Sequence, residues 1–192
     1  MLEELEIYAK NNKIPIMEKE GILFLKEYIK NNNIKTILEL GTAIGYSAIQ
    51  MALLDKNIKI ITIERDEKRY KEAVKNIQNF HLENQITCYF MDIFDFETND
   101  FFDLIFIDAA KSQSIKFFEK FKKNLNKNGT ILTDNIYFHG YTLQKERIES
   151  KNLRQMVHKI RGYIDFLNTN KEFKTEFLEI GDGIAVTTKK QN

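Results

Sequence analysis

Apolar and polar residues along the chain form blocks that predict strands and helices in turn. The predicted buried strands are short apolar runs at 36–40, 58–64, 86–91, 102–108 and 130–134. One predicted helix begins near residue 46, and two others cover 67–79 and 114–125. Near-continuous apolar strands that are joined by amphipathic helices are typical of a parallel sheet covered on both faces. We therefore predict an α/β fold with a doubly wound sheet.

The N-terminal part of the chain precedes this pattern. Residues 2–12 and 18–31 predict two helices, and Pro15 favours an extended segment between them. No repeat, low-complexity tract or Gly/Ser/Pro-rich linker follows anywhere in the sequence. We expect a single domain over residues 1–192, with a helical preface at 1–31.

The C-terminal part predicts a change of strand direction. A long helix at 154–168 precedes two strand-like runs at 175–180 and 184–188. The sequence Gly181-Asp182-Gly183 lies between these runs and favours a tight turn. We expect a C-terminal hairpin that places one antiparallel strand at the end of the sheet.

The composition is that of a globular protein from a reducing compartment. Hydrophobic residues make up 43% and charged residues 30%, and a net charge of +1 argues against a strongly basic nucleic-acid binder. Cys88 is the only cysteine, so no internal disulfide or cysteine-based metal cluster can form, and we expect it to fill a buried strand. The sequence lacks the layout of a signal peptide and any apolar run near the ~20 residues that span a bilayer. We expect a cytoplasmic protein with no membrane partner.

One loop carries most of the chemical information. The first predicted strand leads through Glu39 into Gly41-Thr42-Ala43-Ile44-Gly45, and a helix follows. This spacing lacks the Gly-x-Gly-x-x-Gly pattern that cradles a pyrophosphate. A carboxylate beside the loop repels phosphate and suits a cation, and S-adenosylmethionine (SAM) carries a sulfonium and an ammonium but no phosphate. The loop therefore indicates a SAM-dependent methyltransferase rather than a dehydrogenase.

Each predicted parallel strand ends in an acid or an amide. The carboxyl ends of such strands form the ligand-binding edge of a doubly wound sheet. Glu64 lies 23 residues after Gly41, where a carboxylate binds a ribose diol, and Asp92 suits an adenine amino group. For any one acid, a solvated turn or a helix cap is the plainer alternative.

Three oxygen ligands end neighbouring strands. Asp108, Asp134 and Asn135 offer the ligands that Mg²⁺, or another divalent cation, prefers. A paired-acid proton-transfer site is the alternative, although it has no need of Asn135. Lys111 follows Asp108 by three residues and is a candidate general base beside a cation. A surface lysine at a helix start is the alternative for Lys111.

Three segments together resemble the metal-dependent O-methyltransferases related to catechol O-methyltransferase. They are residues 39–47, Ile107-Asp108-Ala109-Ala110-Lys111 and Thr133-Asp134-Asn135. Within that family, segments 14–19, 133–136 and 181–183 resemble the bacterial tRNA 5-hydroxyuridine O-methyltransferases. The resemblance runs from about residue 8 to 189. Because the chain begins close to the segment at 14–19, we expect the longer N-terminal helix of bacterial relatives to be missing or shortened.

The resemblance implies a fold, a cofactor and a set of contacts. It implies a Rossmann-like class I SAM methyltransferase with a seven-stranded sheet, commonly as a homodimer. It implies Mg²⁺ bound by Asp108, Asp134 and Asn135. The position of Lys111 beside Asp108 makes these two residues the candidate catalytic pair. The implied SAM contacts, together with the acid of the glycine loop, are Met17, Glu39, Gly41, Ser47, Glu64, Asp92 and Asp108.

The resemblance also implies that the acceptor is 5-hydroxyuridine at the wobble position of a tRNA anticodon loop. An unpaired base can be stacked on aromatic side chains, and segment 136–141 offers such a wall, although core packing of Tyr137 or Phe138 explains these residues equally well. A basic stretch suits phosphates, with a solvated helix face as its alternative. Its members are Lys145, Arg147, Lys151, Arg154, Lys159 and Arg161.

Two other functions remain open. A small-molecule enzyme that acts on phenols or catechols would use the same site, and the near-neutral charge favours it mildly. A non-catalytic scaffold that binds SAM or RNA is the second alternative. The metal ligands together with Lys111 argue against the scaffold.

Overall fold

The computed structural model describes residues 1–144 and 148–191. Its strands, in chain order, are β1 (Thr36–Leu40), β2 (Lys59–Glu64), β3 (Ile86–Phe90), β4 (Phe102–Ile107), β5 (Leu125–Asp134), β6 (Phe173–Leu178) and β7 (Ile184–Lys189). Its helices are α1 (Leu2–Asn11), α2 (Lys19–Asn31), α3 (Tyr46–Ala52), α4 (Glu67–Asn79), α5 (Ser114–Phe121) and α6 (Lys151–Asn168), with short 3-10 turns η1 (Lys111–Gln113) and η2 (Lys122–Asn124). None of the helices in these two ranges has the length and apolar character to cross a membrane.

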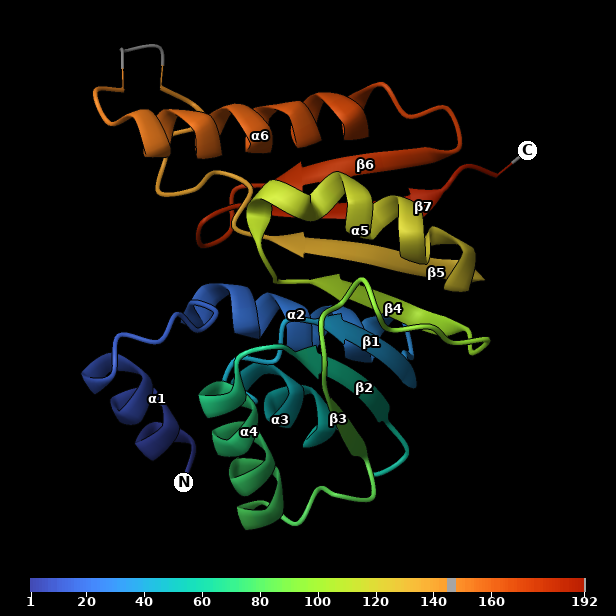
Figure 1. Cartoon of the computed structure of the whole chain (residues 1–192). Helices are drawn as coiled ribbons and strands as arrows, with labels where there is room; N and C mark the ends of the chain where they lie inside the picture. Colours follow the sequence, from blue (N-terminus) through green and yellow to red (C-terminus); the bar gives the residue numbers. More distant parts are fainter. Residues whose placement is uncertain (145–147, 192) are drawn as a thin grey trace.

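The strands form one seven-stranded sheet in the order β3-β2-β1-β4-β5-β7-β6 (Figure 1). Strands β1 to β5 pair in parallel, whereas β7 pairs antiparallel with both β5 and β6. The predicted doubly wound sheet and C-terminal hairpin are therefore confirmed. We expected the antiparallel strand at the edge of the sheet. It lies one position inside, because β7 inserts between β5 and the edge strand β6.

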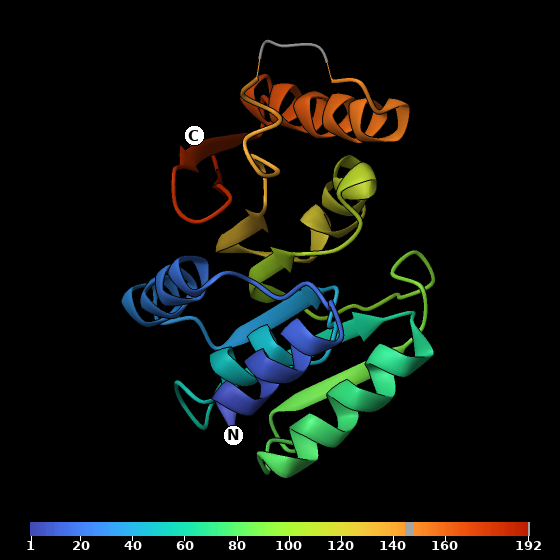
Figure 2. The same cartoon turned by 90° about the vertical axis from the view of Figure 1, so that its left-hand side faces the viewer.

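Alternate side chains of the central strands enter two separate cores. Ile37 packs with residues of α1, α2 and α3, whereas Leu38 and Leu40 pack with residues of α5 and α6. Figure 2 shows α2 and α5 on opposite sides of the sheet. Both clusters contain fully buried strand residues, which explains the near-continuous apolar runs of the central strands.

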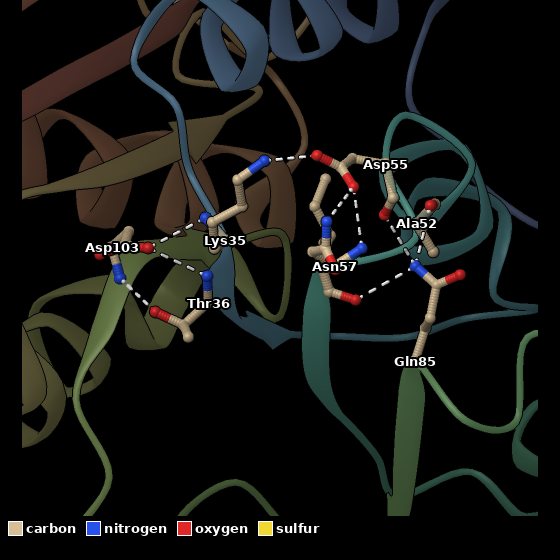
Figure 3. A network of polar contacts seen from close by, with 8 residues as sticks. Lys35, Thr36, Ala52, Asp55, Asn57, Gln85 and Asp103 are labelled. Carbon is tan, nitrogen blue, oxygen red and sulfur yellow. Dashed lines mark hydrogen bonds and ion pairs between the residues drawn. The ribbon is translucent and has the colours of Figure 1, made fainter.

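A polar network closes the amino end of the sheet (Figure 3). Asp103 accepts hydrogen bonds at 2.9 and 3.0 Å from the backbone N–H groups of Lys35 and Thr36, and so joins β4 to β1. The Gln85 amide donates to the carbonyl oxygens of Ala52, Asp55 and Ile58. These contacts fix the turns at this end, while the chain turns at the carboxyl end surround a pocket.

Strand β6 covers residues 173–178 rather than the predicted 175–180, and three further elements differ more clearly in extent. Strand β5 begins at Leu125 rather than residue 130, and its register shifts between the pairs Phe102–Leu125 and Leu104–Thr130. The helix predicted over 114–125 ends as an α-helix at Phe121 and continues as a 3-10 turn. Helix α6 begins three residues earlier than predicted, where the Ser150 hydroxyl caps it.

Candidate active site

A pocket of about 470 Å³ opens at the carboxyl ends of the parallel strands. The loops that follow β1, β2, β3 and β4, together with the residue after β5, contribute to its wall. The sequence-predicted residues that line it are Gly41, Glu64, Asp92, Asp108, Lys111 and Asn135. Residues as far apart in the chain as Gly41 and Asn135 therefore meet at one site.

The glycine at the start of the β1 loop permits the closest approach in this wall. Gly41 has φ +105°, a conformation that side-chain-bearing residues rarely adopt. A Cβ atom there would lie 2.4 Å from the carbonyl oxygen of Asp108. The β1 and β4 loops can thus meet only because residue 41 has no side chain.

Glu64 ties two loops of the pocket together. One carboxylate oxygen accepts the N–H of Ala43 at 2.9 Å, and the other accepts the N–H groups of Arg65 at 2.9 Å and Asp66 at 2.8 Å. A carboxylate has about four acceptor positions, so Glu64 keeps capacity for a further donor. Its location on the pocket wall fits the predicted ribose contact.

Asp92 also has both oxygens engaged. It accepts the N–H of Phe94 at 2.9 Å and lies 3.2 Å from the Arg65 guanidinium. These two contacts lower the pKa of Asp92, the Phe94 N–H having the larger effect. An adenine amino group at this carboxylate would share it with Arg65.

Three of the predicted cofactor contacts do not line the pocket. Glu39 is fully buried beneath the loop, where the hydroxyls of Ser47 and Thr62 each donate to it at 2.5 Å. Burial raises the pKa of the Glu39 carboxyl to about 8. The structure therefore places Glu39 and Ser47 in a bonded pair under the pocket floor.

Met17 is the third such residue. Its side chain is buried against α2, where a Cβ on Gly21 would come within 2.9 Å of the Met17 methyl group. Its neighbours Pro15 and Ile16 line the pocket instead. The segment before α2 thus reaches the site as predicted, but through different side chains.

The acid pair lies at the ends of β4 and β5. The Lys111 ammonium donates to a carboxylate oxygen of Asp108 at 2.9 Å and to the backbone carbonyl of Asp134 at 3.1 Å. The Asp134 side chain is buried just outside the pocket lining. Burial, and then the Asp108 charge, raises the pKa of Asp134 to about 7, while Lys111 opposes that rise.

This donor set fits a divalent cation by its charge and chemistry. The Lys111 ammonium contacts the Asp108 carboxylate but only the backbone of Asp134, so a second positive charge would stabilise the ionised form of the acid pair. Among the described residues, no three His, Cys, Asp or Glu side chains gather in an arrangement that could hold a metal ion. Asn135, which lines the pocket and has a left-handed φ of 63°, would supply the third oxygen of the predicted set through its side-chain amide.

The sequence analysis missed several residues of the site. Arg65, Arg69 and Phe94 line the pocket, and the charge of Asp182 contributes to the raised pKa of Asp134. Asp182 had a visible signal, since it is the centre of the Gly-Asp-Gly turn. That turn predicted the hairpin and contributed to the family resemblance, but it gave Asp182 no place in the site.

The aromatic segment after Asn135 is divided in role. Tyr137 is half-buried and packs against the core that contains α5 and α6. The Phe138 ring lies beside His139 and Tyr141, with centroid distances of 5.6 and 6.3 Å. Core packing therefore explains Tyr137, and the predicted stacking wall narrows to Phe138 and its neighbours.

The predicted basic stretch is only partly available for phosphates. Arg161 donates to backbone carbonyls of Tyr141, Thr142 and Gln144, and Arg154 donates to that of Ile148 at 2.7 Å. Lys151 and Lys159 are exposed. Lys145 and Arg147 lie outside the described residues. Two of the six residues thus hold the loop before α6.

Comparison with known proteins assigns the family. The model of the O-methyltransferase family matches residues 1–190. A Staphylococcus aureus crystal structure, provisionally described as a caffeoyl-CoA O-methyltransferase, is 38% identical and covers 98% of this chain and 92% of that one, with a TM-score of 0.93. The two proteins are therefore similar in sequence as well as in fold over almost the full length of both chains.

Two further proteins are informative. A catechol O-methyltransferase from Niastella koreensis is 38% identical over 123 residues, which cover 60% of this chain and 55% of that protein. An O-methyltransferase from Bacillus cereus in complex with SAH has the same fold, with a TM-score of 0.84 at 24% identity over 98% of this chain and 90% of that one. The match to the family model over almost the whole sequence shows that this chain belongs to the O-methyltransferase family.

Proposed function

We propose that this protein uses SAM and a divalent cation to methylate the 5-hydroxyl of uridine at the tRNA wobble position. The observation that carries the proposal is the acid pair of Asp108 in the pocket lining and Asp134 buried beside it, with the Lys111 ammonium in contact with the Asp108 carboxylate and the Asp134 backbone. Family membership supports methyl transfer to oxygen. The sequence resemblance supports the choice of acceptor.

The pocket residues suit the methyl donor. Glu64 and Asp92 both line the pocket, where Glu64 would accept the ribose hydroxyls and Asp92 would bind the adenine amino group. Gly41, which has no side chain, lets the β1 and β4 loops meet at the pocket wall. Holding the donor and the acceptor in line would supply much of the rate acceleration.

The acceptor side is built from the strand ends. Asp108, Asp134 and Asn135 would hold the cation, and such an ion stabilises an ionised hydroxyl and orients it. Lys111, whose Nζ lies 2.9 Å from an Asp108 oxygen, would take the hydroxyl proton in its neutral amine form. Phe138 and Tyr141 would form one side of a base-binding wall.

A small-molecule O-methyltransferase is the second candidate. The relatives are named for caffeoyl-CoA and catechol. Arg154 and Arg161 of the basic stretch donate hydrogen bonds to backbone carbonyls of this chain, which leaves fewer charges for phosphates. A catechol has two neighbouring oxygens, as 5-hydroxyuridine does in its 5-hydroxyl and 4-carbonyl. The same site therefore accommodates either acceptor.

Mass spectrometry of tRNA nucleosides from a deletion strain tests the proposal. We expect 5-methoxyuridine to disappear and 5-hydroxyuridine to accumulate, and a plasmid copy to reverse both changes. A copy with Asp134→Ala is the matched control and should not restore the modification. Persistence of 5-methoxyuridine in a strain without a second such enzyme would contradict the tRNA assignment.

Transfer of labelled methyl from SAM separates the candidates in vitro. Labelling of hydroxylated tRNA but not of catechol, with loss on EDTA treatment, supports the proposal. The reverse preference supports the small-molecule enzyme. No metal-dependent transfer to either would favour the non-catalytic scaffold.

A further inference from the structure

The segment after the proposed metal ligands packs against the turn between β6 and β7. Figures 1 and 2 show these two loops side by side at one end of the sheet. Backbone N–H groups of Ile136 and Tyr137 donate to the carbonyl oxygens of Gly183 at 3.1 Å and Asp182 at 2.9 Å. A Cβ on Gly183 would lie 2.4 Å from the Tyr137 ring, so the packing leaves no space between the two loops.

The Asp182 side chain extends this contact further along the segment. One carboxylate oxygen accepts the N–H of His139 at 2.5 Å. The other faces the His139 ring nitrogen Nδ1 at 3.5 Å. The side chain is only 8% exposed, and no residue in the described part of the chain donates a hydrogen bond to this second, buried oxygen. A buried carboxylate with an unpaired oxygen costs stability, which suggests a role other than packing.

The backbone that Asp182 holds has an unusual conformation. Asn135, Phe138 and His139 have φ values of 63°, 47° and 56°, in the left-handed region that residues with side chains rarely adopt. Such conformations persist where the surroundings enforce them, and they cluster at functional sites. The hydrogen bonds that the N–H groups of Ile136, Tyr137 and His139 donate to the β6–β7 turn hold the segment in this conformation.

We propose that Asp182 is a positioning residue for the acceptor side of the site. By holding segment 136–139, Asp182 fixes the direction in which Asn135 presents its amide oxygen and in which Phe138 presents its ring. This inference rests on the proposed function, because it assigns Asn135 and Phe138 to the cation and the acceptor. It gives the Gly-Asp-Gly turn a purpose beyond closing a hairpin.

Asp182→Ala and Asp182→Asn form the test pair. Asparagine keeps an oxygen that can accept the His139 N–H, whereas alanine removes it. Glu179→Ala is the control, because Glu179 is an exposed acid near the same turn. The unfolding midpoint of each of the three variants should be measured and compared with that of the wild-type protein, so that kinetic effects are compared among folded proteins.

Amide hydrogen exchange and Mn²⁺ titration give readouts that need no turnover. We expect Asp182→Ala to expose the His139 amide to faster exchange, because it loses its carboxylate acceptor, and Asp182→Asn to retain that protection. Loss of a group that orients a ligand weakens metal affinity by about 10- to 100-fold, so we expect that loss for alanine but not for asparagine or Glu179→Ala.

Steady-state kinetics complete the test. Asp182→Ala should lower kcat/KM for the acceptor by about 10- to 100-fold while the dissociation constant of SAM stays within about twofold. Unchanged exchange, or changed exchange with unchanged Mn²⁺ affinity and acceptor kinetics, would overturn the proposal. If the wild-type protein transferred no methyl group, the proposed function would fail. Unchanged Mn²⁺ affinity in Asp182→Ala would then still overturn the role of Asp182, and a selective loss would support it.

Discussion

The Lys111 ammonium lies 2.9 Å from a carboxylate oxygen of Asp108. The same ammonium donates to the backbone of Asp134, so it holds the ends of β4 and β5 together at the proposed cation site. Lysine and cation would therefore share the negative charge of one acid pair. That relationship makes their effects on the site separable by substitution.

Lys111→Met should affect turnover and metal binding in opposite directions. A general base contributes about 10²- to 10⁴-fold to the rate, so we expect a loss of that order in the methyl-transfer rate. Removal of the ammonium should tighten Mn²⁺ binding, because the acid pair loses a competing positive charge. Lys116→Met, at an exposed lysine on α5, is the control. Weaker Mn²⁺ binding together with normal turnover would refute both roles of Lys111.

Gly41→Ala should damage the pocket and the fold together. The positive φ alone costs about 1–3 kcal/mol for a residue with a side chain, and the Cβ would also collide with the Asp108 carbonyl. We expect lower stability in urea unfolding and weaker SAM binding in calorimetry.

Gly162→Ala is the matched control for that substitution. Gly162 lies within α6, and a Cβ there would meet no atom of the described residues within 4 Å apart from the backbone of its own helix. It should stabilise the protein by about 0.5–1 kcal/mol, because alanine favours helix. Equal effects of the two substitutions would mean that the close approach at Gly41 is misassigned.

Glu39 predicts a pH dependence of stability. Burial raises the pKa of this carboxyl from 4.5 to about 8 in the folded protein. The folded state then holds a proton that the unfolded chain releases above its ordinary pKa. Stability is therefore highest below about pH 4.5 and falls as the pH rises to about 8, by up to about 5 kcal/mol from this group.

Glu39→Gln isolates that contribution. A glutamine amide can keep hydrogen bonds to the Ser47 and Thr62 hydroxyls but does not ionise. Urea unfolding at pH values from 5 to 8 should show a smaller fall in stability for the variant than for the wild-type protein. The Asp134 pKa, also raised, contributes equally to both proteins. Parallel curves would show that the Glu39 charge carries no such cost.

Glu64→Gln should weaken SAM binding. The carboxylate already accepts three backbone N–H groups, and the proposed ribose contact requires its remaining acceptor capacity. Each hydrogen bond to a charged group is worth about 1.5–3 kcal/mol, so we expect at least a tenfold rise in the dissociation constant. Glu67→Gln, at an exposed acid on α4, should have no effect. An unchanged SAM affinity in Glu64→Gln would remove Glu64 from the site.

The sequence predicted the sheet well because buried strands have a strong apolar signal. It missed the start of β5, where Asn126-Lys127-Asn128-Gly129 has the composition of a turn. The structure pairs Leu125 with Phe102, and the Asn126 amide donates to the Asp103 side chain at 2.8 Å. Such partners are about 23 residues away in the chain, and no local pattern indicates them.

The candidate site was predicted by position and less well by side-chain direction. Strand ends identify which acids gather at one edge, and Glu64, Asp92 and Asp108 do line one pocket. Whether an acid faces the pocket depends on its tertiary partners. Glu39 is held below the floor by Thr62 on the neighbouring strand and by Ser47 on α3. Met17 likewise turns into the core while Ile16 faces the site.

The central claim is that the methyl donor and the acceptor oxygen bind to different strand ends of one pocket. The most direct measurement compares SAM affinity and metal-dependent methyl transfer in the wild-type protein and in Asp134→Ala. We predict that transfer in Asp134→Ala falls to the level of an EDTA-treated control, because the variant loses a proposed metal ligand. The SAM dissociation constant should stay within about twofold, because Asp134 is buried outside the pocket lining. Metal-dependent transfer that persists in Asp134→Ala, or a large loss of SAM affinity, would contradict the claim.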